Sequence, residues 1–312
     1  MISSWHLITG SAAYNQQRFD DIRRLEGTNK GRPYLDTTGN PSVGIGYNLR
    51  GNRTVRDDVF LKMQIDPNFT GLSPAQQAAE RGYIAQLNSA VTASYASTAA
   101  LQQALDRIMG ARARDPLFAG ISHITNLTTF TMTDPQMQAV FPTAAQDAEN
   151  KVDAWLAGIP PSNERIALVS LAYNNLIGID LSGQFKSPAL RRAIIDNDRA
   201  EAWYQIRYES NGGQSRITSG QGIATRRYAE SDLFGLYEGA GQPLTEGEAI
   251  NILRTLRVHQ DAIDKYEAQF SVADAGSQYF RLQLQPTYGF LISRFNLGGA
   301  FEEVLVSLNV LG

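Results

Sequence analysis

The spacing of apolar residues predicts a helix near the start of the chain. Phe19, Ile22 and Leu25 lie three residues apart and share one helical face, while the charged residues between them occupy the other face. Gly27 follows this pattern directly, and glycine readily takes the left-handed conformation that ends helices. We therefore predict a helix over residues 16–26.

A β-hairpin is predicted directly after this helix. Residues 38–41 read Thr-Gly-Asn-Pro, which is a turn sequence, and short strands are predicted on either side of it, over 34–37 and 42–47. Gly44 and Gly46 weaken a strand unless something approaches its backbone closely. A hairpin that served packing alone would carry β-branched residues at both positions, so the glycines indicate a close contact.

The rest of the chain is patterned as helices. Residues 163–177 are apolar on nearly all sides, which is typical of a helix buried at the centre of a domain. Further helices are predicted over 73–89, 98–111, 134–141, 144–157, 188–196, 199–208, 225–237, 245–270 and 277–308, the last interrupted near Gly298 and Gly299. The predicted fold class is mostly α (α+β), with the hairpin as its β component.

These elements divide the chain into five segments. They are a lead-in over 1–15, a helix and hairpin over 16–50, a helical insertion over 51–130, a helical lobe over 131–238, and an additional helical segment over 239–312. The insertion is rich in Ala, Gln, Ser and Thr and contains no chemical motif, so a peripheral structural role is expected for it.

Composition narrows the classes of function. The chain has 312 residues, of which 43% are hydrophobic and 19% charged, and this is ordinary for a globular protein. The net charge of −3 argues against a protein held on nucleic acid by its overall charge. The longest uncharged apolar stretch, 166–179, is shorter than the roughly 20 residues that a membrane helix needs, so no membrane span is expected.

Metal and thiol chemistry are not expected either. The chain has no cysteine, and its three histidines lie too far apart in sequence for a local metal motif. No metal or organic cofactor is implied. The first residues show no basic stretch followed by an apolar one, so no secretory signal is expected.

The candidate chemistry lies in the predicted helix and hairpin. Glu26 ends the helix, Asp36 follows ten residues later, and the Ser42 hydroxyl follows six residues after that. Two carboxyl groups that face one cleft are what glycoside hydrolysis needs, one protonated and one ionised. The negative end of a helix disfavours an ionised carboxylate, which suits Glu26 to act as the proton donor.

This segment resembles a known family. Glu26, Asp36-Thr37-Thr38-Gly39 and Ser42-Val43-Gly44-Ile45-Gly46-Tyr47 are similar to the signature of phage T4-type lysozymes (glycoside hydrolase family 24), a Glu followed by D-T-x-G-x-x-T-[IV]-G-x-G-H. Further on, 167–178 resembles the family's buried helix, and 222–234 resembles the endolysin stretch G-x-x-x-R-R-x-x-E-x-x-L-F. The resemblance covers about 16–50 and 131–237.

The resemblance implies roles for three catalytic residues. Glu26 is the general acid, and Asp36 is either the base for a water molecule or a stabiliser of the transition state. Ser42, which stands where the family usually has Thr, helps to hold that water. The family inverts configuration, which requires room for a water molecule between the carboxyl groups.

The resemblance also implies three residues that bind substrate or support the site. Arg226 is a charge partner of Glu26, and Asn174 contacts the saccharide. Tyr47 stands where the family often has His, and is either a structural residue or a substrate contact.

Simpler interpretations compete with these roles. Glu26 by itself is an ordinary exposed helix end, and Asp36 is equally suited to cap its own turn. Asn174 is equally well a buried amide in the core, while Arg226 and Arg227 are most simply a solvated helix start. The three histidines are expected to have no particular role.

The resemblance implies a two-lobed lysozyme-like fold and the activity of a muramidase, which hydrolyses the β-1,4 bond between N-acetylmuramic acid and N-acetylglucosamine in peptidoglycan. The alternatives are a lytic transglycosylase and a non-catalytic peptidoglycan-binding module. The expected setting is the bacterial periplasm, reached as a phage lysin or as a delivered antibacterial effector. Peptidoglycan strands are the expected partner, with delivery machinery or an immunity protein in addition, and the protein is expected to be a monomer.

Overall fold

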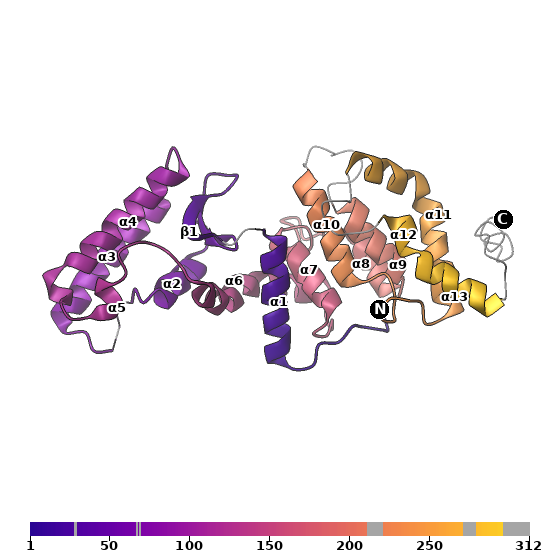
Figure 1. The fold of residues 1–312 in the computed structure, drawn as a ribbon, viewed down its shortest axis with the longest axis horizontal. Helices are drawn as coiled ribbons and strands as arrows, with labels where there is room; N and C mark the ends of the chain where they lie inside the picture. Colours follow the sequence, from indigo (N-terminus) through magenta and orange to yellow (C-terminus); the bar gives the residue numbers. More distant parts are fainter. Residues whose placement is uncertain (28–29, 67, 69, 211–220, 271–278, 296–312) are drawn as a thin grey trace. The chain divides into compact units, whose positions relative to one another are not determined.

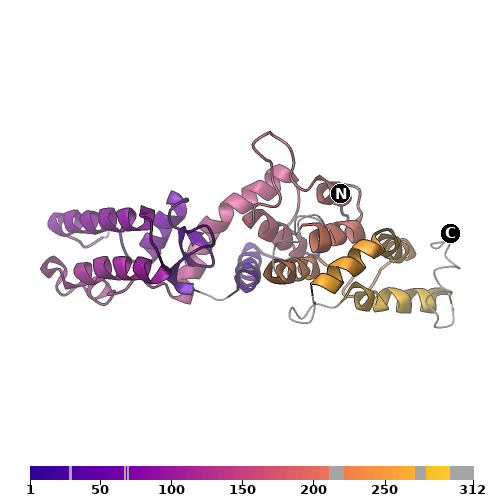
Figure 2. The same ribbon diagram turned by 90° about the horizontal axis from the view of Figure 1, so that it is seen from above.

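The computed structural model describes residues 1–27, 30–66, 68, 70–210, 221–270 and 279–295. It is mostly helical with one small antiparallel sheet of three strands, which confirms the predicted fold class. Figures 1 and 2 show these helices from two directions. In this part of the chain no helix is both long enough and apolar enough to cross a membrane.

The chain forms two compact units. Residues 19–146 form the first, which we call the hairpin unit, and residues 1–18 with 147–312 form the second, which we call the helical unit. The division falls within α1 (Ser11–Leu25) and within α6 (Asp134–Trp155), so each of these helices contributes to both units. The segment 51–130 belongs to the same unit as the hairpin.

The sheet of the hairpin unit contains strands β1 (Lys30–Leu35), β2 (Pro41–Gly44) and β3 (Tyr47–Asn48), paired in that order. The first strand ends earlier than predicted because Asp36 already forms the turn, where its N–H donates to the Asn40 carbonyl at 3.0 Å. A third strand is added because the chain reverses again at Gly44, which has a φ of +66°.

The helices of the hairpin unit follow the sheet. They are α2 (Arg53–Lys62), α3 (Pro74–Thr92), α4 (Thr98–Arg114), η1 (Pro116–Phe118), α5 (Ser122–Thr125) and the first part of α6. Ser73 opens α3 with a capping box that it forms with Gln76, and Pro74 is the first helical residue. α3 and α4 lie side by side, and α4 also packs against β1 (Figure 1). The Arg112 guanidinium bridges these two helices by donating to the buried Glu80 at 2.7 Å.

One prediction in this unit is wrong. Two separate helices were expected over 134–141 and 144–157, but α6 runs through Pro142 without interruption. A proline removes one backbone hydrogen bond from a helix, and tertiary packing can offset that loss. The neighbouring Phe141 supplies such packing, because its fully buried ring contacts the ring of Phe19 edge-on at 5.4 Å between centroids.

The helical unit is built around α7 (Asn163–Tyr173), whose residues 166–172 are all buried. This confirms the predicted central helix. Around it lie α8 (Pro188–Ile195), α9 (Arg199–Tyr204) with its continuation η2 (Gln205–Glu209), α10 (Gln221–Phe234), α11 (Glu246–Gln269), α12 (Phe280–Gln283) and α13 (Gln285–Phe295). The predicted break near Gly298 and Gly299 lies outside the described residues.

Residues 1–10 form an extended strap along the helical unit. The Ile2 N–H donates to the Ile194 carbonyl at 2.8 Å, and the Ile8 N–H donates to the Pro161 carbonyl at 3.0 Å. The strap is shorter than the predicted lead-in, because α1 already begins at Ser11.

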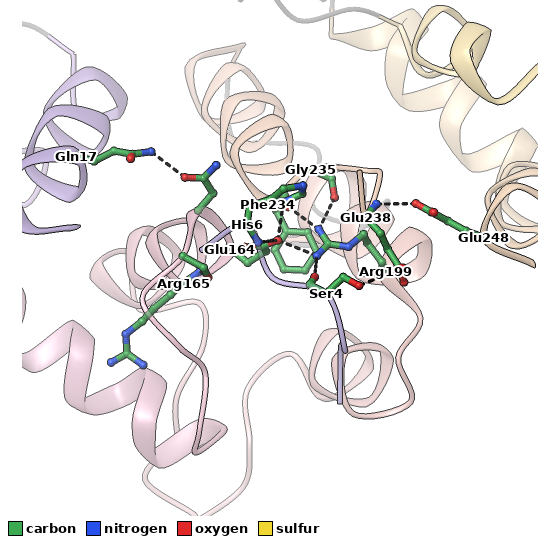
Figure 3. A network of polar contacts seen from close by, with 12 residues as sticks. Ser4, His6, Gln17, Glu164, Arg165, Arg199, Phe234, Gly235, Glu238 and Glu248 are labelled. Carbon is green, nitrogen blue, oxygen red and sulfur yellow. Dashed lines mark hydrogen bonds and ion pairs between the residues drawn. The ribbon is translucent and has the colours of Figure 1, made fainter. Parts of the chain in front are cut away.

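A buried carboxylate holds the strap in place (Figure 3). Glu164 has no exposed surface and accepts hydrogen bonds from the His6 N–H at 3.1 Å, from His6 Nδ1 at 2.7 Å and from Arg199 Nη2 at 2.7 Å. The same arginine donates to the Phe234 and Gly235 carbonyls. His6 is therefore a structural residue, and the expectation that it has no particular role is wrong.

His6 makes the stability of the helical unit depend on pH. Its hydrogen bond to Glu164 raises the pKa of His6 above 6.5, although burial acts in the opposite direction. The folded protein thus keeps this proton to higher pH than the unfolded chain. The contribution to the free energy of unfolding is complete below pH 6.5 and is lost as pH rises through the raised pKa.

We therefore expect His6→Gln to lower the melting temperature more at pH 5.5 than at pH 9, as measured by circular dichroism. The wild type at both pH values is the reference, because the difference between the two proteins at each pH isolates the contribution of His6. An equal loss for His6→Gln at both pH values would contradict the prediction.

Gly44→Ala should destabilise the hairpin unit. An added Cβ would lie 2.9 Å from the Tyr47 ring and 3.2 Å from the Met137 sulfur, at a left-handed φ of +66°. We expect a loss of about 2–4 kcal/mol in the free energy of unfolding, measured by urea denaturation. Gly39→Ala is the control, because its φ is also positive but no atom lies within 4 Å, so it should lose about 1 kcal/mol. Equal losses would contradict the role of the contact.

Candidate active site

Glu26 lies where the sequence predicts, at the C-terminal end of α1. Its N–H donates to the Ile22 carbonyl at 2.9 Å, and Gly27 then ends the helix with a φ of +83°. The Glu26 residue is half-buried. The last carbonyl groups of a helix make this end electronegative, and Glu26 lies directly at it.

Asp36 lies at the end of β1 and caps its own turn. Its Oδ1 accepts hydrogen bonds from the Thr38 N–H at 2.8 Å, the Thr38 hydroxyl at 2.7 Å and the Asn40 N–H at 2.8 Å. Burial raises the pKa of Asp36, but the hydrogen bonds from Asn40 and Thr38 outweigh it, and the pKa is lowered. Asp36 is therefore ionised near neutral pH, and its second oxygen, Oδ2, takes none of these three bonds.

Tyr34 is a further residue of this region, and sequence reasoning missed it. The pKa of Tyr34 is raised first by burial and then by the negative charges of Glu26 and Asp36, which both act on its hydroxyl. A hydrogen bond from the Gly46 N–H acts in the opposite direction. The Lys30 ammonium lies 4.1 Å from the centre of the Tyr34 ring. A signal for Tyr34 was available in the sequence. Residues two apart in a strand point to the same face, and Tyr34 precedes Asp36 by two residues.

Ser42 shares this face of the sheet. It pairs with Tyr34 across β1 and β2, and with Asn48 across β2 and β3. Side chains of paired residues point to the same face, so Tyr34, Ser42 and Asn48 form a row across the three strands. The Ser42 residue is only 2% exposed. The hairpin unit thus contains Glu26, Asp36, Ser42 and Tyr34, and the strand register places Tyr34 beside Ser42.

Tyr47 has a structural role. It pairs with Val43, one residue further along β2 than Ser42, and so belongs to the opposite face of the sheet. It is 1% exposed, and its hydroxyl donates to the Met137 carbonyl at 2.6 Å. Its ring lies against Gly44, which supplies the close contact that the glycines predict.

The other two predicted residues belong to the helical unit. Asn174 is exposed at the end of α7, where its side chain donates to the Ser170 carbonyl at 2.9 Å, so it is not a buried core amide. Arg226 donates to Glu230 Oε1 at 3.0 Å and to the Ser170 hydroxyl at 2.9 Å. Its charge is thus offset by a carboxylate of its own unit.

The expectation of a solvated helix start at Arg226 and Arg227 is wrong. Both are buried, and both donate to Glu230, which has no exposed surface. A carboxylate buried to this extent needs a cation beside it, and two successive arginines on α10 supply that charge.

Neither a metal site among the described residues nor a known relative gives further information on this candidate site. Among the described residues, no three His, Asp or Glu side chains form a group that could hold a metal ion. No family model, curated protein or solved structure matches the chain.

The hydrogen bonds of the turn should control the ionisation of Asp36. Thr38→Val removes the hydroxyl that donates to Oδ1, so the pKa of Asp36 should rise, while Thr38→Ser retains the hydroxyl and should leave it nearly unchanged. Carboxyl-detected NMR titration measures both. The lowered pKa of Asp36 stabilises the folded state at pH values above the pKa of this residue in the unfolded chain, and this stabilisation is lost as pH falls. Thr38→Val should therefore also lose less stability on acidification than the wild type does. An unshifted Asp36 titration in Thr38→Val would show that the hydroxyl has no such effect.

Proposed function

We propose that the protein is a muramidase, a glycoside hydrolase that cleaves the β-1,4 bond between N-acetylmuramic acid and N-acetylglucosamine in peptidoglycan. One observation carries this proposal. Glu26 ends α1, and Asp36 and Ser42 lie on the β1–β2 hairpin that follows it within the same unit, with Ser42 paired to Tyr34 across the strands. The resemblance of this segment of the sequence to the phage lysozyme signature, at the same residues, supports the proposal.

The environments of the two carboxyl groups suit different roles. Glu26 follows the electronegative end of α1, and it donates a proton to the leaving glycosidic oxygen as the C–O bond breaks. Asp36 is held ionised by its turn, and its carboxylate accepts a proton from the attacking water or stabilises the positive charge on the sugar ring. Pairs of carboxyl groups whose environments favour opposite protonation states are typical of acid–base catalysis on sugars.

Ser42 and Tyr34 complete the proposed mechanism by positioning. Ser42 stands across from Tyr34 and has a hydroxyl that can orient the water molecule. The Tyr34 hydroxyl accepts a hydrogen bond from the Gly46 backbone, which restricts its position. We propose an inverting reaction, as in the family that the hairpin resembles. Arg226, Asn174 and any part of the helical unit that binds the saccharide remain proposals at the level of that resemblance.

The proposed setting follows from the charge of the chain. A protein of net charge −3 is not drawn to an acidic cell wall by bulk attraction, so delivery or local basicity of the cleft must replace that attraction. We propose action in the bacterial periplasm, as a phage lysin or as the enzymatic part of a delivered antibacterial effector. An immunity protein or the delivery machinery is the proposed protein partner, and the enzyme is proposed to act as a monomer.

The clearing of purified peptidoglycan tests the two carboxyl groups. We expect Glu26→Gln and Asp36→Asn each to lower the rate of turbidity loss by about 10²–10⁴-fold, the usual effect of removing acid–base groups. Asp57→Asn is the matched control, because Asp57 is an exposed carboxylate of the same unit on α2, and it should keep the wild-type rate. Unchanged clearing by both active-site variants would refute the assignment.

The products of the same digestion separate the hydrolase from its rivals. Mass spectrometry should find reducing N-acetylmuramic acid ends that have gained water. Anhydromuramic ends would instead identify a lytic transglycosylase, which needs no water and no second carboxylate. Binding of peptidoglycan without any product would identify a non-catalytic module.

A further inference from the structure

Arg50 lies between the turn that contains Asp36 and the end of α3. It comes shortly after β3 and is half-buried. Its guanidinium Nη2 donates to the carbonyl of Ala93, the residue that caps the C-terminal end of α3. Its Nη1 donates to the side-chain oxygen of Asn40 over 3.5 Å. Arg50 thus connects the turn to a helix of the same unit.

A chain of hydrogen bonds leads from Arg50 to Asp36. The Asn40 amide nitrogen donates to the Thr38 hydroxyl at 2.6 Å, and this hydroxyl donates to Oδ1 of Asp36 at 2.7 Å. The Asn40 N–H donates to the same Oδ1 at 2.8 Å. Asn40 therefore contacts Arg50 through one end of its amide group and the turn of Asp36 through the other.

The donors and acceptors give this chain a single direction. An arginine side chain has only donors, so the oxygen of Asn40 must face Arg50 and the amide nitrogen must face Thr38. An amide nitrogen can only donate, so the Thr38 hydroxyl accepts from it and gives its one proton to Asp36. Without Arg50, the Asn40 amide would be free to turn over and present its oxygen to Thr38, whose proton would then turn away from Asp36.

α4 supports the other side of the same turn. Its first residue, Thr98, accepts a hydrogen bond at 3.1 Å from the N–H of Leu35, which directly precedes Asp36. Arg32 and Asp106, the charged pair between β1 and α4, neutralise each other. The turn is thus held by the ends of two helices, α3 through Arg50 and α4 through Thr98.

Arg50 is the cation that this hydrogen-bond chain reaches. Burial raises the pKa of Tyr34 on β1, and the charges of Glu26 and Asp36 raise it further. Burial also raises the pKa of Tyr95, in the connection between α3 and α4, while the charge of Arg50 acts in the opposite direction. Both tyrosines therefore stay uncharged over the acidic range in which Asp36 titrates.

We propose that Arg50 is a positioning residue for Asp36. Through Asn40 it fixes the direction of the Thr38 hydroxyl, which holds Oδ1 of Asp36 and leaves Oδ2 to the reacting water or the sugar. Its effect reaches the carboxylate through neutral groups, so the guanidinium does not compete for the reacting oxygen. This role rests on the proposed function, in which Asp36 is the second carboxyl group.

The titration of Asp36 tests this role without a substrate. We expect Arg50→Met, which keeps the apolar stem, to raise the pKa of Asp36, because the Thr38 hydroxyl is no longer held toward Oδ1. Arg50→Lys retains a charged donor and should restore the wild-type pKa in part. Arg53→Met is the matched control, because it removes an equal charge from an exposed site on α2, and it should leave the pKa of Asp36 unchanged. Carboxyl-detected NMR measures all three.

Two further variants separate positioning from a general loss of structure. Asn40→Ala retains the bond from Arg50 to Ala93 but breaks the chain, and should raise the pKa of Asp36 as Arg50→Met does. In a Thr38→Val background, Arg50→Met should add little to the rise, because the chain is already broken. The proposal is overturned if the two changes add in full, or if Asp36 titrates in Arg50→Met as in the wild type.

The pH dependence of peptidoglycan clearing is a second measurement. Asp36 acts as an ionised group, so the clearing rate should fall as pH drops through its pKa. Arg50→Met should move this fall to higher pH and lower the maximal rate by about threefold to tenfold, less than the loss of an acid–base group itself. Arg53→Met should keep the wild-type profile.

The two measurements distinguish failure of this role from failure of the proposed function. If the wild type clears peptidoglycan but Arg50→Met leaves the titration of Asp36 unchanged, the positioning role is overturned and the proposed function stands. If the wild type clears nothing while Arg50→Met still raises the pKa of Asp36, the proposed function is overturned, and Arg50 orients a carboxylate that serves another purpose.

Discussion

The structure depends on pairing carboxylates that have no access to water. A buried carboxylate is stable only where cations and hydrogen-bond donors replace its lost hydration, and removing one partner of such a pair costs about 3–5 kcal/mol. Glu80, Glu164 and Glu230 are all almost fully buried. Arginines supply the countercharge in each case: Arg112 for Glu80, Arg199 for Glu164, and Arg226 with Arg227 for Glu230. The first two pairs join two helices each, α3 with α4 and α7 with α9, while the arginines of Glu230 lie on its own helix, α10.

The candidate catalytic residue Asp36 differs from these buried carboxylates in its hydrogen-bond donors. Asp36 takes its hydrogen bonds from neutral groups of its own turn, and the carboxylate is held ionised without a bound arginine. An arginine locked onto Asp36 would compete with a water molecule or a sugar for the same oxygens. Asp36 thus differs from the buried carboxylates in what compensates its charge.

Much of the fold was predictable because local signals agreed with tertiary packing. The helix that ends at Gly27, the turn at 38–41 and the apolar run of α7 all appear as the sequence indicates. Pro142 is the exception, since its local preference to interrupt a helix is overridden by the packing of Phe141. Long-range contacts of this kind leave no local trace in a sequence.

The candidate site was predictable only in part, for a similar reason. Residue spacing identified Glu26, Asp36 and Ser42, but Tyr34 becomes visible only once the register of β1 and β2 is known. Likewise, two adjacent arginines on a helix look solvated until the buried Glu230 beside them is known. Charge burial cannot be deduced from the identity of a charged residue, because its partner decides it.

The strap has a consequence for the order in which the chain folds. The hairpin unit is one continuous stretch, 19–146, so all of its residues are available to one another early in synthesis. His6, by contrast, can form its hydrogen bonds only after Glu164, 158 positions later, has been synthesised. The ion pair of Glu164 in turn forms only after Arg199 has been synthesised. Domains generally fold as units, beginning with the first to emerge from the ribosome. The pair Glu26 and Asp36 is therefore assembled while the strap that precedes it in the chain is still unbound.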